Sequence, residues 1–272
     1  MKIAFLWMGQ GCTVAAPAAI AGDLAALFPL LARPAGPSAV PDVVVERVPA
    51  GFAVVAGGVP EPCASAVEAV SAAELAVTRH LLAAERRHCH LHASAALAGS
   101  GGAVVALGPS GSGKSTLAYA WYRLGRPVFG DDVVAVDDRG RLHPFPRPLK
   151  VHAARLREAG EAPEETVAWD PSEEDVWVDP LPRAGWAEGG AEVAVLAEIR
   201  FVPGAETRLE AVRDAQRLRM LLDAVHQTGT SREDSLDRLI GLAEGAAVFR
   251  VEFGRAAEAA PLLLDIAGSR QR

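Results

Sequence analysis

A glycine-rich run with one lysine and four hydroxyl side chains holds the clearest chemistry in this sequence. The run is Gly108-Pro109-Ser110-Gly111-Ser112-Gly113-Lys114-Ser115-Thr116, which fits the pattern G-x-x-x-x-G-K-[ST]. Its glycines let backbone N–H groups turn inward around a phosphate, the lysine can reach the outer phosphate oxygens, and the serine hydroxyl can ligate Mg²⁺. The run therefore predicts a phosphate-binding loop (P-loop) for a nucleoside triphosphate.

The segments on either side of the run predict the elements that such a loop needs. Ala103–Leu107 is a short apolar run typical of a buried strand, and Thr116–Leu124 is a helical segment ended by Gly125. The N-terminus of that helix would add its positive dipole to the phosphate site. The alternative is a Gly/Ser-rich turn with no ligand, but the strand, the helix and the complete motif together favour the triphosphate.

Two adjacent acids, Asp131 and Asp132, interrupt an apolar strand expected over Pro127–Val136. Consecutive strand residues point to opposite faces, so at least one acid should face a covered side. Burying an unpaired carboxylate is costly, which favours a metal, a cation or a catalytic task as its partner. The alternative is a bulge or an exposed edge that leaves both acids in water.

Asp137 competes with this pair for the role of metal-binding acid. It follows four apolar residues, Val133–Val136, as a simple Walker B pattern would require. It also begins the sequence Asp-Asp-Arg-Gly, which has turn chemistry and explains Asp137 without any ligand. We therefore expect Asp131 and Asp132, and not Asp137, to serve the triphosphate.

A histidine-rich strand precedes the loop. A helix is expected over Ser65–Arg87, followed by the run His88–Leu97 and a Gly-rich turn before the P-loop strand. Two strand-like runs joined by such a turn predict a hairpin, so the P-loop strand should have an antiparallel neighbour that carries His92. His88, His90 and His92 alternate onto one face and invite a metal site, but no second ligand cluster with zinc spacing accompanies them. A core histidine is the other alternative for His92.

Taken together, these parts resemble a known family. His92-Ala93-Ser94, the P-loop and Gly130-Asp131-Asp132 follow the order and spacing of the catalytic domain of the HPr kinase/phosphorylase family. Within it, the chain is most similar to the short HPr-kinase-related proteins, including the kinases of lasso-peptide precursors. The similarity spans roughly residues 88 to 136, and Pro144–Leu149 also resembles the short relatives.

The resemblance implies a serine kinase that uses ATP and Mg²⁺. On the matching positions, Asp131 is the catalytic acid/base, His92 its partner, Lys114 a phosphate ligand, and Ser115 and Asp132 the residues at the metal. The chain lacks a counterpart of the long N-terminal domain and a recognisable downstream signature of the full-length members. A peptide or protein hydroxyl, such as one in a biosynthetic precursor peptide, is therefore the expected acceptor, and not HPr itself. Since relatives form oligomers, a homo-oligomer is one expectation.

The source of a cation for the transition state is a separate question. Arg147, between two prolines, is the first candidate. Arg213 and Arg217 are weaker ones, because a solvated helix face is the default for arginines on a helix.

Composition narrows the classes of partner. The formal net charge of −7 argues against a nucleic-acid binder, whose footprint would be basic. Three scattered cysteines favour a reducing compartment over a disulfide framework, and no uninterrupted apolar stretch approaches the length of about 18 residues that a membrane span needs. We expect a cytoplasmic protein with no membrane or nucleic-acid partner, and ATP is the default nucleotide because no Asn-Lys-x-Asp motif occurs.

The expected fold is α/β: a mixed, twisted sheet around the P-loop, like the C-terminal domain of HPr kinase, plus a small β-rich subdomain. Residues 1–62 would form that subdomain or docking layer, and residues 63–272 the catalytic domain, with an acidic, solvated loop over 161–190. In the N-terminal part the pattern predicts three strands and one helix: Ile3–Trp7, Val43–Val48, Phe52–Val55 and Ala18–Leu31.

Two other functions fit the same motifs. A nucleotide-binding regulatory module would bind ATP or GTP and transfer nothing to a protein. A small-molecule kinase would use the same phosphate chemistry on a different hydroxyl. Slow hydrolysis without a labelled acceptor identifies the first, and a closed, small acceptor pocket identifies the second.

Overall fold

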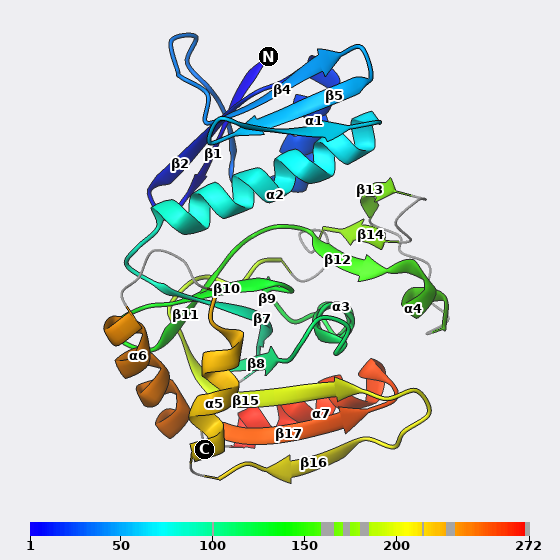
Figure 1. Cartoon of the computed structure of the whole chain (residues 1–272). Helices are drawn as coiled ribbons and strands as arrows, with labels where there is room; N and C mark the ends of the chain where they lie inside the picture. The colour runs from blue at the N-terminus through cyan, green and yellow to red at the C-terminus, as the bar shows by residue number, and fades with distance from the viewer. Residues whose placement is uncertain are drawn as a thin grey trace. The chain divides into compact units, whose positions relative to one another are not determined.

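The computed structural model describes residues 1–99, 101–158, 166–170, 175–179, 185–213, 215–226 and 232–269. The chain divides into two compact units (Figure 1). The first contains Met1–Arg86 and most of β13 (Thr166–Asp170), and the second contains the rest. In the described part of the chain, no helix is long and apolar enough to cross a membrane.

The first unit is a six-stranded sheet covered by a long helix. Its strands have the order β3-β1-β2-β4-β5-β6, with β2 parallel to β4 and every other pair antiparallel. Its elements are β1 (Lys2–Trp7), β2 (Gln10–Ala15), α1 (Ala18–Leu27), β3 (Ala32–Pro34), β4 (Val43–Val48), β5 (Gly51–Ala56), β6 (Val59–Cys63) and α2 (Ala66–Ala84). The β-rich character expected for this part is present, and β2, β3 and β6 are strands that the sequence pattern did not predict.

The boundary between the units lies later than expected from the sequence, at Arg86 instead of residue 62. The reason is the helix α2, whose apolar face, including Ala73, Val77 and Leu81, is buried against β2, β4 and β5. The helix begins as predicted, because the Ser65 side chain accepts a hydrogen bond from the Glu68 N–H. The Glu68 carboxylate in turn accepts the N–H of Ala64.

The second unit is built on a mixed sheet, as predicted. The strand order is β11-β10-β7-β8-β15-β17-β16, and β9 also pairs with β7. Strands β8, β15 and β17 are mutually parallel, whereas β7 and β16 run antiparallel to their neighbours. Figure 1 shows β15, β17 and β16 side by side at one side of this sheet.

Helices cover both faces of this sheet. Helices α3 and α7 pack on the face of β8 that carries Val104 and Ala106, and α5 and α6 pack on the face that carries Val105 and Leu107. The elements are β7 (Cys89–Leu97), β8 (Ala103–Leu107), α3 (Lys114–Arg123), β9 (Val128–Gly130), β10 (Val133–Val136), β11 (Arg141–Pro144), β12 (Leu149–His152), α4 (Ala153–Glu158), β14 (Asp175–Val178), β15 (Ala191–Phe201), β16 (Arg208–Ala211), α5 (Ala215–Ala224), α6 (Arg232–Gly245), β17 (Ala247–Phe253) and α7 (Ala256–Ser269).

The hairpin before the glycine-rich loop is confirmed. Strand β7 pairs antiparallel with β8, from Ala93 opposite Leu107 to Leu97 opposite Ala103. The N–H of Ala98 donates to the carbonyl of Gly102 and closes the turn. On its other side, β7 pairs antiparallel with β10, where His92 stands opposite Val133. The strand carrying His92 therefore lies between the loop strand and the strand that follows the two acids.

Two predictions about strands need correction. The strand expected over Pro127–Val136 is broken into β9 and β10, because the chain bends at the two acids, where Gly130 lies close to the Val133 carbonyl; β7 still pairs with both strands in one register, with Ala95 opposite Gly130 and His92 opposite Val133. The region 161–190, expected to be a solvated loop, contains strand β14, whose Val176, Trp177 and Val178 are buried. Strand β14 pairs with β12 and buries its apolar side chains, although the sequence around it is acidic. Residues 159–165, 171–174 and 180–184 of that region lie outside the described part.

Candidate functional site

The glycine-rich loop joins β8 to α3 and needs glycine at two positions. A Cβ on Gly108, at φ 155°, would lie 2.7 Å from the Ser112 Oγ and 2.9 Å from the Ile199 carbonyl oxygen. Gly113 is in the left-handed region at φ 98° and caps the N-terminus of α3, where a Cβ would lie 2.8 Å from Phe253. The loop thus turns tightly from the strand into the first turn of the helix, as the motif predicted.

Lys114 lies inside this turn. Its side chain is buried, and Nζ donates to the carbonyls of Gly108 at 2.7 Å and Pro109 at 3.1 Å. Burial lowers the pKa of Lys114, while the nearby Asp132 and Asp131 carboxylates act in the opposite direction. The loop therefore holds an ammonium group beside two acids.

Asp131 is the buried member of the acidic pair, with 3% of its side chain exposed. Its Oδ2 accepts the backbone N–H of Lys150 at 2.9 Å, and it accepts a hydrogen bond from the Ser115 hydroxyl. Burial raises the pKa of Asp131 to about 6, against the lowering effect of Arg147, whose Nη2 lies 3.8 Å from Oδ1. This confirms that one acid faces a covered side, and it gives a carboxylate whose protonation changes near neutral pH.

Asp132 differs from its neighbour in exposure and in charge state. Its side chain is 38% exposed, and Arg147 Nη2 lies 3.3 Å from Oδ2. His92 Nδ1 lies 2.9 Å from Oδ1, so the histidine that the resemblance assigned to Asp131 pairs with Asp132 in the structure. Burial alone would raise the pKa of Asp132, but the hydrogen bond from His92 and the charge of Arg147 outweigh it and hold that pKa below its usual range. Two adjacent carboxylates with opposite shifts are suited to different tasks.

Arg147, the first-choice cation, is in this site. Its side chain is 9% exposed, and its guanidinium lies over the Trp177 ring, 5.4 Å from the ring centroid, while Nη2 faces both acids. The two weaker candidates lie elsewhere. Arg217 donates to the carbonyls of Val212 and Ala243, and Arg213 is exposed outside the cavity.

His226 belongs to the site and was not predicted. Its ring packs edge-on against His92 with 5.4 Å between centroids, and it hydrogen-bonds the backbone carbonyl of Asp132. Its backbone N–H donates to the carbonyl of His90 at 2.9 Å. Burial lowers the pKa of His226, against the raising effect of Asp132. The sequence around it has no motif, so only the folded chain places it here.

The sequence offered two alternative metal sites, one at Asp137 and one on the histidine-rich strand, and the structure forms neither among the described residues. Asp137 holds its own turn: Oδ1 accepts the N–H groups of Arg139 and Arg141, and Oδ2 lies 2.9 Å from His143 Nε2. The expectation that Asp137 is a turn residue is therefore confirmed. His88, just before β7, and His90 and His92 on it do not form a group of metal ligands; within the described part of the chain, the group of side chains that could hold a metal ion is a different one, in the first unit.

A cavity of about 520 Å³ is lined by most of the site residues, whereas Arg147 and His226 contact the acids without lining it. Its walls include the loop residues Ser110, Gly111, Gly113, Lys114, Ser115 and Thr116, the two acids with His92, and also Lys150, His152 and Asp175. Gly108 and Pro109 do not line the cavity, and their carbonyls accept hydrogen bonds from Lys114. Ser112, also predicted at the phosphate, is buried outside the cavity wall, where its carbonyl accepts the Phe201 N–H.

A second cavity, of about 570 Å³, contains none of the predicted site residues. Its walls are Asp138, Arg139, Gly140, Glu192, Val193, Asp237, Arg238, Gly241, Leu242 and Gly245. Charges of both signs are interspersed there, without a buried carboxylate or a glycine-rich turn. The predicted loop residues and acids therefore line the cavity at the loop, although that cavity is slightly smaller.

This arrangement combines an anion-binding element with a proton acceptor. The backbone of the loop, the N-terminus of α3 and Lys114 suit a phosphate, and Asp131 suits a hydroxyl proton. Asp132 stays ionised beside them and can neutralise or orient a cation. No protein-family model matches the chain, and no curated protein matches it, so its chemistry is inferred from these residues.

Proposed function

We propose that the protein is an ATP-dependent kinase that transfers the γ-phosphoryl group to a hydroxyl, with a serine of a peptide or protein as the acceptor. The observation that carries the proposal is Asp131: a buried carboxylate with a pKa near 6, hydrogen-bonded to Ser115, in one cavity with Lys114. Carboxylates with a strongly shifted pKa in a cavity are concentrated at functional sites.

The phosphate half of the site fits a triphosphate. The loop supplies inward-turning backbone, and Lys114 can exchange the two loop carbonyls that it now contacts for β- and γ-phosphate oxygens. Ser115 and Asp132 are oxygen donors that would hold Mg²⁺. The ion would neutralise charge on the transferring group, which is its general task in phosphoryl transfer.

The hydroxyl half of the site depends on Asp131. In the proposed step Asp131 accepts the proton of the acceptor hydroxyl, and the hydroxyl oxygen forms a bond to the γ-phosphorus. The bond from the γ-phosphorus to the bridging oxygen breaks, and ADP leaves with that electron pair. A pKa near 6 leaves Asp131 mostly ionised at pH 7 yet basic enough to take the proton.

Arg147 and His92 have distinct tasks in this proposal. Arg147 faces both carboxylates and can stabilise the negative charge that develops on the γ-phosphoryl oxygens. His92 positions Asp132 through a 2.9 Å contact and keeps it ionised. The buried positions of Asp131 and Arg147 mean that neither needs to move far during transfer.

The experiment supplies ATP labelled in the γ-phosphoryl group, with Mg²⁺, and peptide libraries in which serine, threonine or tyrosine is the sole hydroxyl. Free serine and glycerol serve as small acceptors. Wild type should label the serine library, Asp131→Asn should lose transfer by about 10²-fold or more while nucleotide affinity is kept, and Asp138→Asn, an exposed turn residue, should behave as wild type. Full transfer by Asp131→Asn contradicts the assignment of the base. Label recovered only as inorganic phosphate indicates a regulatory module. Label recovered only on free serine indicates a small-molecule kinase.

A further inference from the structure

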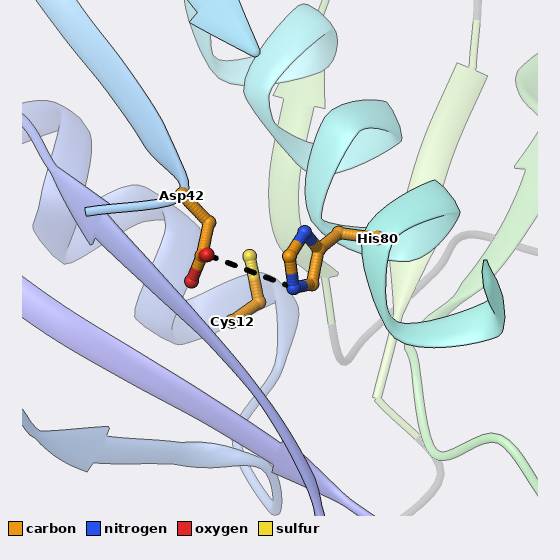
Figure 2. A group of neighbouring side chains, drawn as sticks. All are labelled: Cys12, Asp42 and His80. Carbon is orange, nitrogen blue, oxygen red and sulfur yellow. Dashed lines mark ion pairs between the residues drawn. The ribbon is translucent and has the colours of Figure 1, made fainter. Parts of the chain in front are cut away.

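Three side chains in the first unit form a second cluster that the proposed kinase does not use (Figure 2). Cys12 lies on β2, Asp42 immediately precedes β4, and His80 lies on α2. One ligand atom of each, a thiol sulfur, a carboxylate oxygen and an imidazole nitrogen, lies within 4.8 Å of the other two. Figure 2 shows the three side chains converging on one point.

From this convergence we propose that Cys12, Asp42 and His80 form a binding site for a zinc ion, with one coordination position left open to solvent. Zinc accepts sulfur, nitrogen and oxygen ligands in four-coordinate geometry, with three protein ligands when one position is open. At the usual bond lengths, neighbouring ligand atoms of tetrahedral zinc are about 3.3 to 3.6 Å apart. The His80 Nε2 to Asp42 Oδ1 distance of 3.8 Å is too long for a hydrogen bond but close to this ligand separation.

Asp42 is fixed for this task by the backbone. Its Oδ2 accepts the N–H of Thr13 at 2.8 Å, and its own N–H donates to the Thr13 carbonyl at 2.7 Å. These bonds tie the carboxylate to the strand residue next to Cys12 and leave Oδ1 turned toward His80. Such outer contacts are how proteins orient metal ligands before the ion arrives.

The different burial of the three residues indicates from which side a metal ion would reach the site. Cys12 is fully buried, whereas the side chains of His80 and Asp42 are 36% and 37% exposed. An ion can therefore reach the site past the histidine and the carboxylate, with the sulfur at the bottom. The same burial argues against a nucleophilic cysteine, since the pKa of Cys12 is raised to about 12 by burial and by Asp42.

A bound ion would connect three elements that are distant in sequence. It would join α2 to β2 and to the segment before β4, all within the first unit. The helix already packs on this sheet through an apolar face, so the ion would add a polar link at the edge of that contact. The site does not depend on the proposed kinase activity, whose residues all belong to the second unit.

Cobalt(II) is the probe that tests the site in the full-length chain. It replaces zinc in four-coordinate sites, and a thiolate ligand gives a charge-transfer absorption that no other ligand type in this cluster can give. Wild type should bind one Co²⁺ per chain with this absorption, and added Zn²⁺ should remove it. Cys12→Ser should abolish the absorption, His80→Gln should weaken Co²⁺ binding by more than about tenfold, and Cys63→Ser, a buried cysteine of the same unit, should change neither.

The outcomes separate a site from adventitious binding. An absent charge-transfer band in wild type, or an equal band in Cys12→Ser, overturns the proposal. If circular dichroism shows that Cys12→Ser does not fold, Co²⁺ binding by Asp42→Asn and His80→Gln tests the proposal instead. Both residues are partly exposed, so their replacement should not affect the core. As an independent readout, Zn²⁺ should slow amide exchange in α2 of wild type and leave exchange in His80→Gln unchanged.

Discussion

Asp131→Asn should make the protein more stable at neutral pH while it removes phosphoryl transfer. The native state holds the pKa of Asp131 at about 6, well above the ordinary value of 3.8, mainly because the carboxylate is buried. An acid whose pKa is raised on folding binds more protons in the native state than in the unfolded state between those two pH values. Stability therefore falls as pH rises from about 4 to about 6 and stays low above it.

The size of this effect follows from the shift. A rise of about two units corresponds to about 3 kcal/mol of destabilisation by the ionised carboxylate at pH above 6. Asparagine is neutral at every pH and can still accept the Lys150 N–H through its carbonyl oxygen. We therefore expect Asp131→Asn to exceed wild type in free energy of unfolding by up to about 3 kcal/mol above pH 6, and to match it below pH about 4.

The neighbouring acid supplies the matched comparison. The pKa of Asp132 is lowered in the folded protein, by His92 and Arg147 acting against burial. The ionised Asp132 carboxylate therefore stabilises the folded protein at pH values above its pKa in the unfolded chain. This stabilisation is lost as the pH falls. Asp132→Asn should destabilise the protein at neutral pH, opposite in sign to Asp131→Asn, although the two residues are adjacent.

Urea unfolding by circular dichroism between pH about 4 and about 8 measures these differences. Amide exchange in α3 reports the second unit alone, which matters because two units need not unfold together. The reasoning is refuted if Asp131→Asn is less stable than wild type at pH about 8, or if its difference from wild type does not change with pH.

Three further results are expected. Transfer by wild type should rise with pH around pH 6 as Asp131 loses its proton, measured as initial rates across buffers; a rate that falls over this range contradicts a base role. Lys114→Met should weaken ATP binding by at least about tenfold in a fluorescence titration, with unchanged affinity as the contrary result. Gly113→Ala should destabilise the protein by about 1–2 kcal/mol in urea, and more than Gly125→Ala, because both have positive φ but only Gly113 has a neighbour, Phe253, in the way; equal losses would remove that explanation.

The glycine-rich loop, its strand and helix and the hairpin before it could be predicted because their signals are local. Each depends on residues a few positions apart: glycines at positive φ, a capping pattern, or two apolar runs around a turn. The mixed sheet followed from that hairpin, since the antiparallel partner of the loop strand is the strand immediately before it in sequence.

The interior of the site could be predicted only in part. The acids and His92 were identified, but the bend at the acids that separates β9 from β10 was not, because an uninterrupted strand fits the apolar residues on both sides equally well. His226 reaches Asp132 only because the end of α5 lies beside β7, where Leu91 and Val225 form a bridge. Contacts between elements far apart in sequence leave no local pattern.

The cluster in the first unit was missed for the same reason. Cys12, Asp42 and His80 are separated by 30 and 38 residues, and none belongs to a spaced metal motif. Only the packing of α2 on the sheet brings the histidine to the other two. Their residue types could be read from the sequence, but their convergence could not.

The central claim is that Asp131 accepts a hydroxyl proton beside a bound triphosphate. A single-turnover experiment tests it most directly: enzyme in excess over γ-labelled ATP, with Mg²⁺ and the serine library, and products separated into phosphopeptide and free phosphate. The account predicts label on serine with wild type, and ATP bound but unreacted with Asp131→Asn. Label released only as free phosphate by wild type, or phosphoserine formed equally fast by Asp131→Asn, would contradict it.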